Sequence, residues 1–318
     1  MKALCLLLRV FNLRPLAPIA AALLVVGCAA PLPPRPEIPH GAGLLWQIEK
    51  EGLQPSYVFG TMHVPDPEFL ALAPAIEDAL ERSQQVAVEL KTERKEAAAQ
   101  LQLYVDAALL PDGQSLQDLL DPGAYAQVLR IALRQQPRRI WVGPYHISQF
   151  KPWFVMEVVG KADSTASHLS RSRPVLDGML ERRALRAGKT VIGLETFEEQ
   201  LAVSNGMPMA DQVALLKAHL GNYNNWHYYA AHADTYRQGD TAMMYGLWRQ
   251  SLTGVESELA HRYTERYLDG RNRVMVDRAL PLMEEASTFV AVGALHLPGE
   301  QGVLRLLERQ GYRVTRLN

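Results

Sequence analysis

The sequence predicts a mixed α/β fold in which both ends of the chain build a central, largely parallel sheet, with a large helical insertion between them. Three segments, at residues 85–90, 189–194 and 288–293, are almost continuously apolar, which is typical of strands covered on both faces. Strand and helix patterns alternate at both ends of the chain, whereas the middle is mainly helical. This order favours one sheet assembled from distant parts of the chain.

The first half begins with a predicted hairpin, because strand patterns at 44–48 and 57–62 flank the turn Gln54-Pro55-Ser56. Apolar residues at helical spacing then predict a helix over 68–82. The remaining expected elements are a strand at 85–90, a mainly helical region at 93–161, and a helix at 177–187 that is closed by Gly188.

The second half begins with the strand at 189–194, which Glu195 follows. A long helical region is expected over about 197–285, with interruptions near Met207-Pro208, Gly239 and Gly270. The last expected elements are a strand at 288–295, a helix at 299–310 and a strand at 312–317.

The N-terminus predicts an exported lipoprotein. Lys2, Arg9 and Arg14 precede an apolar run at 16–26 that is too short to span a bilayer and fits a secretory signal. Val25-Val26-Gly27-Cys28 resembles the lipobox of bacterial lipoproteins, which implies cleavage before Cys28 and lipid attachment to it. The alternative is an ordinary signal with an incidental cysteine.

Three regions are therefore expected: a signal peptide at 1–27, a Pro-rich tether at 28–43 and an α/β domain at 44–318. The tether has five prolines and two glycines within residues 29–43, which disfavours regular structure. Lipoproteins that are retained in the inner membrane typically have Asp after the lipidated cysteine, whereas this chain has Ala29. We therefore expect the protein to lie on the periplasmic face of the outer membrane, with lipid on Cys28 as the membrane contact.

Charge and missing motifs exclude several classes of protein. With 33 basic and 34 acidic residues the chain carries no broad basic field, so nucleic acid is not an expected partner. The sequence contains no HExxH, Walker loop, GxGxxG or GxSxG motif, which disfavours ordinary zincin, P-loop and α/β-hydrolase mechanisms.

Four polar residues stand where predicted strands end: His63, Glu89, Glu195 and His296. Ligands of open α/β sheets bind beyond the carboxyl ends of the strands, so these side chains converge if the strands are parallel neighbours. Each histidine belongs to a Gly-x-x-His segment, Gly60 to His63 and Gly293 to His296, and the glycine allows another group to approach closely.

Two imidazoles and a carboxylate suit a divalent metal such as Mn, Co, Zn or Fe, and the same groups could perform metal-free acid–base work. We assign His63, Glu89 and His296 as the metal ligands. Each histidine could instead be a structural, hydrogen-bonded residue, and Glu195 could cap the helix that begins near Thr196.

Several segments, in order, resemble the TraB/GumN (Tiki-like) family over about residues 44–317. They are the segments 57–64 (YVFGTMHV), 86–90 (VAVEL), 151–154 (KPWF), 188–200, Arg271-Asn272 and 289–314, which includes VGALHLPG. The resemblance implies a fold related to the erythromycin-esterase and heme-uptake lipoprotein superfamily. It also implies a site of both Gly-x-x-His histidines, Glu89 and Arg271.

Gly270 stands where the family often has Glu, so Arg273 is an alternative to Arg271 if the register differs by two. A guanidinium beside a metal-bound water could stabilise an oxyanion or bind a substrate carboxylate. Glu89, Arg271 and Glu195 are therefore the predicted catalytic residues.

Animal Tiki members are metal-dependent proteases, so the resemblance implies a lipid-anchored envelope hydrolase that acts on a peptide or a small molecule. The alternative is a non-catalytic envelope protein that uses the same cleft to bind a ligand such as heme.

Overall fold

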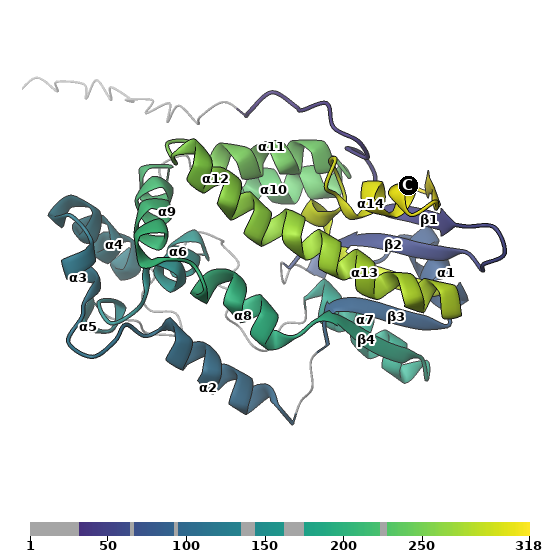
Figure 1. Cartoon of the computed structure of the whole chain (residues 1–318), viewed down its shortest axis with the longest axis horizontal. Helices are drawn as coiled ribbons and strands as arrows, with labels where there is room; N and C mark the ends of the chain where they lie inside the picture. The colour runs from purple at the N-terminus through teal and green to yellow at the C-terminus, as the bar shows by residue number, and fades with distance from the viewer. Residues whose placement is uncertain (1–31, 64–66, 92–94, 135–143, 162–174, 223–227) are drawn as a thin grey trace, which may run out of the picture. The chain divides into compact units, whose positions relative to one another are not determined.

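The computed structural model describes residues 32–63, 67–91, 95–134, 144–161, 175–222 and 228–318 (Figure 1). The predicted signal peptide, Cys28 and the first residues of the predicted tether lie outside these ranges. No helix among the described residues is both long and apolar enough to cross a membrane.

A six-stranded mixed sheet forms the centre of the fold, in the order β4-β3-β5-β2-β1-β6. The strands β4, β3, β5 and β2 run parallel to one another, whereas β1 is antiparallel to β2 and to β6. The two ends of the chain therefore build one sheet, which confirms the predicted fold class. The strand bounds are β1 Leu45–Glu49, β2 Ser56–Thr61, β3 Gln85–Leu90, β4 Thr190–Glu195, β5 Thr288–Gly293 and β6 Arg313–Arg316.

Alternating side chains bury both faces of this sheet. Along β3, Val86 and Val88 belong to one hydrophobic cluster and Ala87 belongs to a second. Along β5, Phe289 belongs to the first cluster and Val290 to the second. The first cluster includes residues of α1 (Pro74–Arg82), α7 (Leu176–Arg186), α10 (Tyr228–Arg237) and α11 (Thr241–Ser251). The second includes residues of α13 (Gly270–Glu285) and α14 (Val303–Arg309), and Figure 1 shows α13 crossing in front of the strands.

The insertion is helical, as predicted, and has two hydrophobic clusters of its own, one around Leu116, Ile131 and Leu216 and one around Trp153 and Tyr263. Its helices are α2 (Ala97–Ala108), α3 (Leu116–Leu119), α4 (Pro122–Arg134), α5 (Pro144–Ile147), α6 (Pro152–Lys161), α8 (Phe197–Asn205), α9 (Met209–Asn222) and α12 (Ser257–Thr264).

Three predicted elements differ from the structure. The helix expected over 68–82 is a 3₁₀ turn, η1 (Pro67–Leu70), followed by α1, because Pro74 begins the helix and disfavours a helical conformation of the residue before it. The strand expected over 288–295 ends at Gly293 and continues as a 3₁₀ turn, η3 (Ala294–His296). The last helix begins at Val303, four residues later than expected (303 − 299).

Residues 32–43 contain no helix or strand, but several of them contact the domain. Arg35 pairs with Asp240 at 2.9 Å, and the backbone N–H of Gly43 donates to the carbonyl oxygen of Gly239 at 2.8 Å. The described end of the Pro-rich segment is therefore packed onto the folded domain.

Candidate active site

The four strand-end residues lie at one edge of the sheet. Glu89 and Glu195 belong to the C-terminal ends of β3 and β4, His296 ends the turn η3 that follows β5, and His63 lies two residues beyond β2. Because β4, β3, β5 and β2 are parallel neighbours in that order, their carboxyl ends meet at the same edge.

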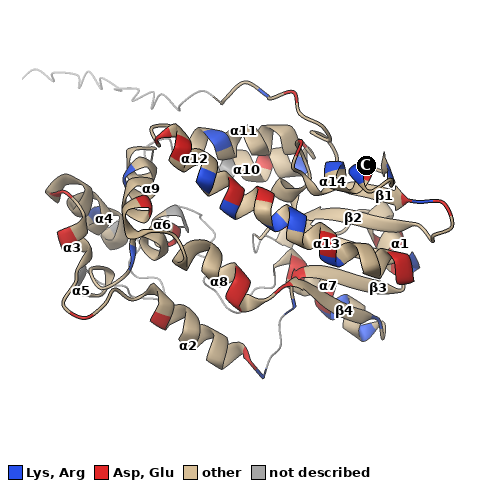
Figure 2. Cartoon of the chain, in the orientation of Figure 1, with Lys and Arg blue, Asp and Glu red and all other residues tan. Residues whose placement is uncertain are grey.

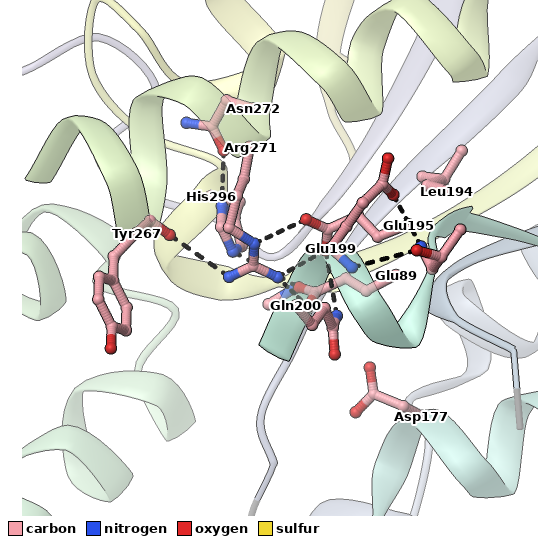
Figure 3. Close-up of polar contacts among 12 residues, drawn as sticks. Glu89, Asp177, Leu194, Glu195, Glu199, Gln200, Tyr267, Arg271, Asn272 and His296 are labelled. Atoms are coloured by element: carbon pink, nitrogen blue, oxygen red, sulfur yellow. Dashed lines mark hydrogen bonds and ion pairs between the residues drawn. The ribbon is translucent and has the colours of Figure 1, made fainter. Parts of the chain in front are cut away.

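Arg271 links the two carboxylates (Figure 3). Its Nε donates to Oε1 of Glu195 at 2.8 Å, and its Nη2 donates to Oε2 of Glu195 at 2.6 Å and to Oε2 of Glu89 at 3.0 Å. The side chains of Glu89 and Glu195 are only 6% and 3% exposed, and carboxylates are rarely buried this deeply without a charge-assisted partner such as Arg271. Burial opposes the charge on Arg271, but both carboxylates raise its pKa further above the ordinary arginine value.

A π-helical turn, η2 (Glu265–Asp269), joins α12 to α13 and positions Arg271, the second residue of α13. The backbone N–H of Gly270 donates to the carbonyl oxygen of Glu265, five residues earlier, and a Cβ on Gly270 would lie 2.9 Å from that oxygen. Such turns inside α-helices occur frequently at functional sites. The interruption expected near Gly270 is therefore this turn, and the close approach explains why glycine fits there.

Arg271, not the alternative Arg273, reaches the strand-end carboxylates. Arg273 forms an ion pair with Glu265 on the exposed side of the helix. The other alternative, that Glu195 caps the following helix, is also wrong. Thr196 is the N-cap of α8 and forms a capping box with Glu199.

Asn272 fixes the protonation of His296. Its Nδ2 donates to the carbonyl oxygen of Gln301 at 2.7 Å, so its Oδ1, 2.6 Å from Nδ1 of His296, acts as an acceptor. Nδ1 of His296 therefore carries the hydrogen, and Nε2 carries the lone pair. Burial lowers the pKa of His296 to about 4, although Glu89 acts in the opposite direction, so the imidazole is neutral at pH 7.

Glu89 stays ionised despite its burial. Burial alone would raise its pKa, but His296, His63 and Arg271, together with a 2.5 Å hydrogen bond from the backbone N–H of Gly293, lower it to about 2. A Cβ on Gly293 would lie 3.1 Å from Oε1 of Glu89. The glycine of the second Gly-x-x-His segment therefore lets the carboxylate approach the backbone, as its sequence position predicts.

His63 interacts with a residue that the sequence did not single out, Asp177 at the start of α7. Nε2 of His63 lies 3.2 Å from Oδ2 of Asp177, and Oδ1 of Asp177 accepts a hydrogen bond from Thr61 at 2.8 Å. The protein atoms around the imidazole partly desolvate it and oppose its charge, but the hydrogen bond and the negative charge of Asp177 raise the pKa of His63. Since 57% of the His63 side chain is exposed, this pair is more accessible to water than the other site residues.

Sequence reasoning missed Asn272 and Asp177 as members of the site. Asn272 could have been found, because it follows Arg271 in the Arg-Asn pair. An amide beside a predicted catalytic arginine is a candidate hydrogen-bond partner for another site residue. Nothing in the spacing around Asp177 indicates that the start of α7 lies beside the end of β2.

Glu89 and His296 fit a cation. Nε2 of His296 lies 3.6 Å from Oε1 of Glu89, so a lone pair faces an ionised carboxylate oxygen. Glu89, Glu195 and Arg271 together carry a net charge of −1 (two carboxylates and one guanidinium), which also favours a positive ion. A histidine whose other nitrogen is held by a hydrogen bond is the usual arrangement of a metal ligand. The described residues contain no group of three or more His, Cys, Asp or Glu side chains arranged to hold an ion, so His63 as a third ligand stays a prediction.

A cleft adjoins this network. It has a volume of about 680 Å³, and Glu195 and Arg271 line it together with residues of α8, α9, α12 and η2. This volume lies within the usual range for ligand-binding sites in proteins.

The fold and the site define an α/β protein with a buried Glu–Arg–Glu network and a histidine at the carboxyl edge of a mainly parallel sheet. The TraB/PrgY/gumN family matches residues 44–316, and the chain belongs to this family. No solved structure matches the chain, so the expected relation to the erythromycin-esterase and heme-uptake fold stays a prediction.

Similar proteins include animal metalloproteases. The chain is 24% identical to the Metalloprotease TIKI homolog of Amphimedon queenslandica over 86% of this chain and 61% of that protein. It is 26% identical to Metalloprotease TIKI1 of Danio rerio, over 85% of this chain and 62% of that protein. It is 27% identical to Metalloprotease TIKI2 of the same species, over 85% of this chain and 60% of that protein. The matches therefore cover less than two thirds of the length of these relatives.

Proposed function

We propose that this protein is a metal-dependent hydrolase of the cell envelope that cleaves peptide bonds, with Glu89 and His296 as two ligands of a divalent ion. The observation that carries the proposal is the 3.6 Å approach of the His296 Nε2 lone pair to the ionised Glu89 carboxylate. The metalloprotease names of the similar animal proteins support the choice of reaction.

Each residue of the network has a role in this proposal. Glu89 and His296 would hold a divalent ion, which would supply an activated water molecule or polarise a carbonyl group. Asn272 keeps Nε2 of His296 free, and Arg271 holds Glu89 ionised, while Glu195 orients Arg271. Nε2 of His63 contacts Asp177, which leaves Nδ1 as its ligand atom if His63 is the third ligand.

Arg271 is mainly a positioning residue in this arrangement. Of its five N–H groups, those on Nε and Nη2 bind carboxylates, and Nη1 donates to the carbonyl oxygen of Tyr267 at 3.3 Å. No described residue accepts a hydrogen bond from the second N–H of Nη1, so this group can bind a substrate oxygen, which is how Arg271 contributes to charge stabilisation.

The proposed location follows from the sequence. The lipobox-like segment ending at Cys28 supports lipid attachment, and Ala29 supports the periplasmic face of the outer membrane. A peptide or a small molecule of the envelope is the proposed substrate.

Metal binding and cleavage measured together test the proposal. Purified protein is titrated calorimetrically with Mn, Co, Zn and Fe(II), and cleavage of a synthetic peptide library is followed by mass spectrometry. We expect metal binding and metal-dependent cleavage by the wild type, and loss of both in Glu89→Ala and His296→Ala.

His261→Ala is the matched control, because His261 is an exposed residue of α12. It is expected to leave both measurements unchanged. Equal metal binding by the wild type and His296→Ala would refute the metal site. Metal binding without any cleavage would refute the hydrolase and favour an envelope binding protein.

A further inference from the structure

The cleft beside Arg271 contains one arginine whose charge is not balanced. Arg266, in η2, lines the cleft, and its Nη1 donates to the carbonyl oxygen of Ala202 in α8 at 3.1 Å. Among the residues that the structure describes, no carboxylate lies within ion-pair distance of Arg266. Its remaining N–H groups are therefore available to a ligand.

Each of the other charged residues that line the cleft has a partner of opposite charge. Asp211 pairs with Arg262 at 3.2 Å, and Glu195 pairs with Arg271. Glu199 pairs with Arg278 at 2.6 Å, and Glu265 pairs with Arg273. Figure 2 shows acidic and basic residues interspersed along α12 and α13. Apart from the Glu89–Arg271–Glu195 network, which is one negative charge in excess, Arg266 is therefore the uncompensated charge of the cleft.

The cleft also has apolar walls that suit a peptide. Met207 and Pro208, which join α8 to α9, face the cleft together with Leu259 and Val274 of the opposite helices. Gly206 leaves room for Arg266, because a Cβ there would lie 3.1 Å from Nη1. Arg266 is an exposed residue beside these apolar walls, so its guanidinium can be reached by a ligand that enters the cleft from solvent.

We infer that this cleft is the substrate subsite and that Arg266 binds a carboxylate of the peptide, either an acidic side chain or the chain terminus. The inference rests on the proposed function, since it names the substrate class of that site. Arg271 and Glu195 line the same cleft, so a peptide held by Arg266 extends towards Glu89 and His296.

Peptide binding tests the subsite separately from cleavage. Three fluorescein-labelled peptides of one length are compared by fluorescence anisotropy in buffer containing a chelator, so that metal-dependent cleavage does not consume them. One has internal Glu residues and an amidated end, one has Gln in their place and a free terminal carboxylate, and one has Gln and an amidated end.

We expect the wild type to bind one of the two carboxylate-containing peptides about tenfold more tightly than the neutral peptide, as for one charge-assisted hydrogen bond. The preferred peptide identifies the source of the carboxylate. Arg266→Gln is expected to remove this preference, and Arg266→Lys to retain part of it. Arg82→Gln removes an arginine of α1 that pairs with Asp78 and does not line the cleft, and it is expected to keep the preference.

Equal binding of all three peptides by the wild type would overturn the inference, and so would an unchanged preference in Arg266→Gln. If Arg266 only stabilises the end of α8 through Ala202, Arg266→Gln lowers the unfolding midpoint in urea without changing the preference. Absence of cleavage with the preference intact would instead refute the hydrolase and leave the subsite standing.

Discussion

Nε2 of His296 and Oε1 of Glu89 face each other at 3.6 Å, and the hydrogen bond from Nδ1 of His296 to Asn272 leaves no hydrogen on either of the facing atoms. Two facing lone-pair donors repel unless a proton, a water molecule or a cation lies between them. A buried site with a net charge of −1 favours the cation, which is why this pair, rather than either residue alone, defines the candidate metal site.

Replacing Asn272 tests the tautomer argument. Asn272→Ala is expected to weaken metal binding by about 10- to 100-fold, the usual effect of removing the hydrogen-bond partner of a histidine ligand. Calorimetric titration measures the change. Asn222→Ala is the control, because Asn222 also binds backbone carbonyl oxygens but lies at the end of α9. Equal metal affinity in Asn272→Ala and the wild type would contradict the assigned role.

Removing Arg271 is expected to destabilise the fold. Arg271→Ala leaves the nearly buried carboxylates of Glu89 and Glu195 without a counter-charge, which costs about 3–5 kcal/mol in the free energy of unfolding. Arg82→Ala breaks an exposed ion pair with Asp78 and is expected to cost less than about 1 kcal/mol. Urea unfolding measures both, and similar values for the two variants would show that the buried network adds no stability.

The π-helical turn before Arg271 predicts that Gly270 does not tolerate a side chain. Gly270→Ala places a Cβ 2.9 Å from the carbonyl oxygen of Glu265, and we expect a destabilisation of about 1–3 kcal/mol together with weaker metal binding. Gly221→Ala in α9 meets no atom of the described residues within 4 Å, so it is expected to stabilise the protein by up to about 1 kcal/mol, the ordinary effect of alanine in a helix. Opposite signs for the two substitutions support the argument, and equal effects contradict it.

Acid sensitivity follows from a buried histidine outside the site. Burial lowers the pKa of His232 in α10 from 6.5 to about 4, so the folded state binds fewer protons than the unfolded state between these values. Its contribution to stability is complete above pH 6.5 and is lost as the pH falls towards 4, by an amount on the order of 3 kcal/mol.

His232→Gln is expected to reduce the slope of stability against pH in this range, as measured by urea unfolding at pH 4.5 to 7.5. The slope will not vanish, because burial lowers the pKa of His296 in the same direction. An unchanged slope in His232→Gln would show that the pKa of His232 is the same in the folded and unfolded protein.

The sequence by itself determined the fold class and the strand-end residues. Strands covered on both faces are almost continuously apolar, so Gln85–Leu90 could be placed to the residue, and the polar residues that end such strands were visible as interruptions. Since parallel strands of one sheet end at a common edge, the grouping of Glu89, Glu195 and His296 was also predictable.

Only the tertiary structure decided how these residues interact. Asp177 meets His63, Asn272 fixes His296, and Arg266 faces the cleft because segments far apart in the chain pack together. The π-helical turn likewise aims Arg271, rather than Arg273, at the carboxylates. Such contacts depend on helix positions and rotations of a few ångströms, which packing of the whole core determines and local sequence patterns do not encode.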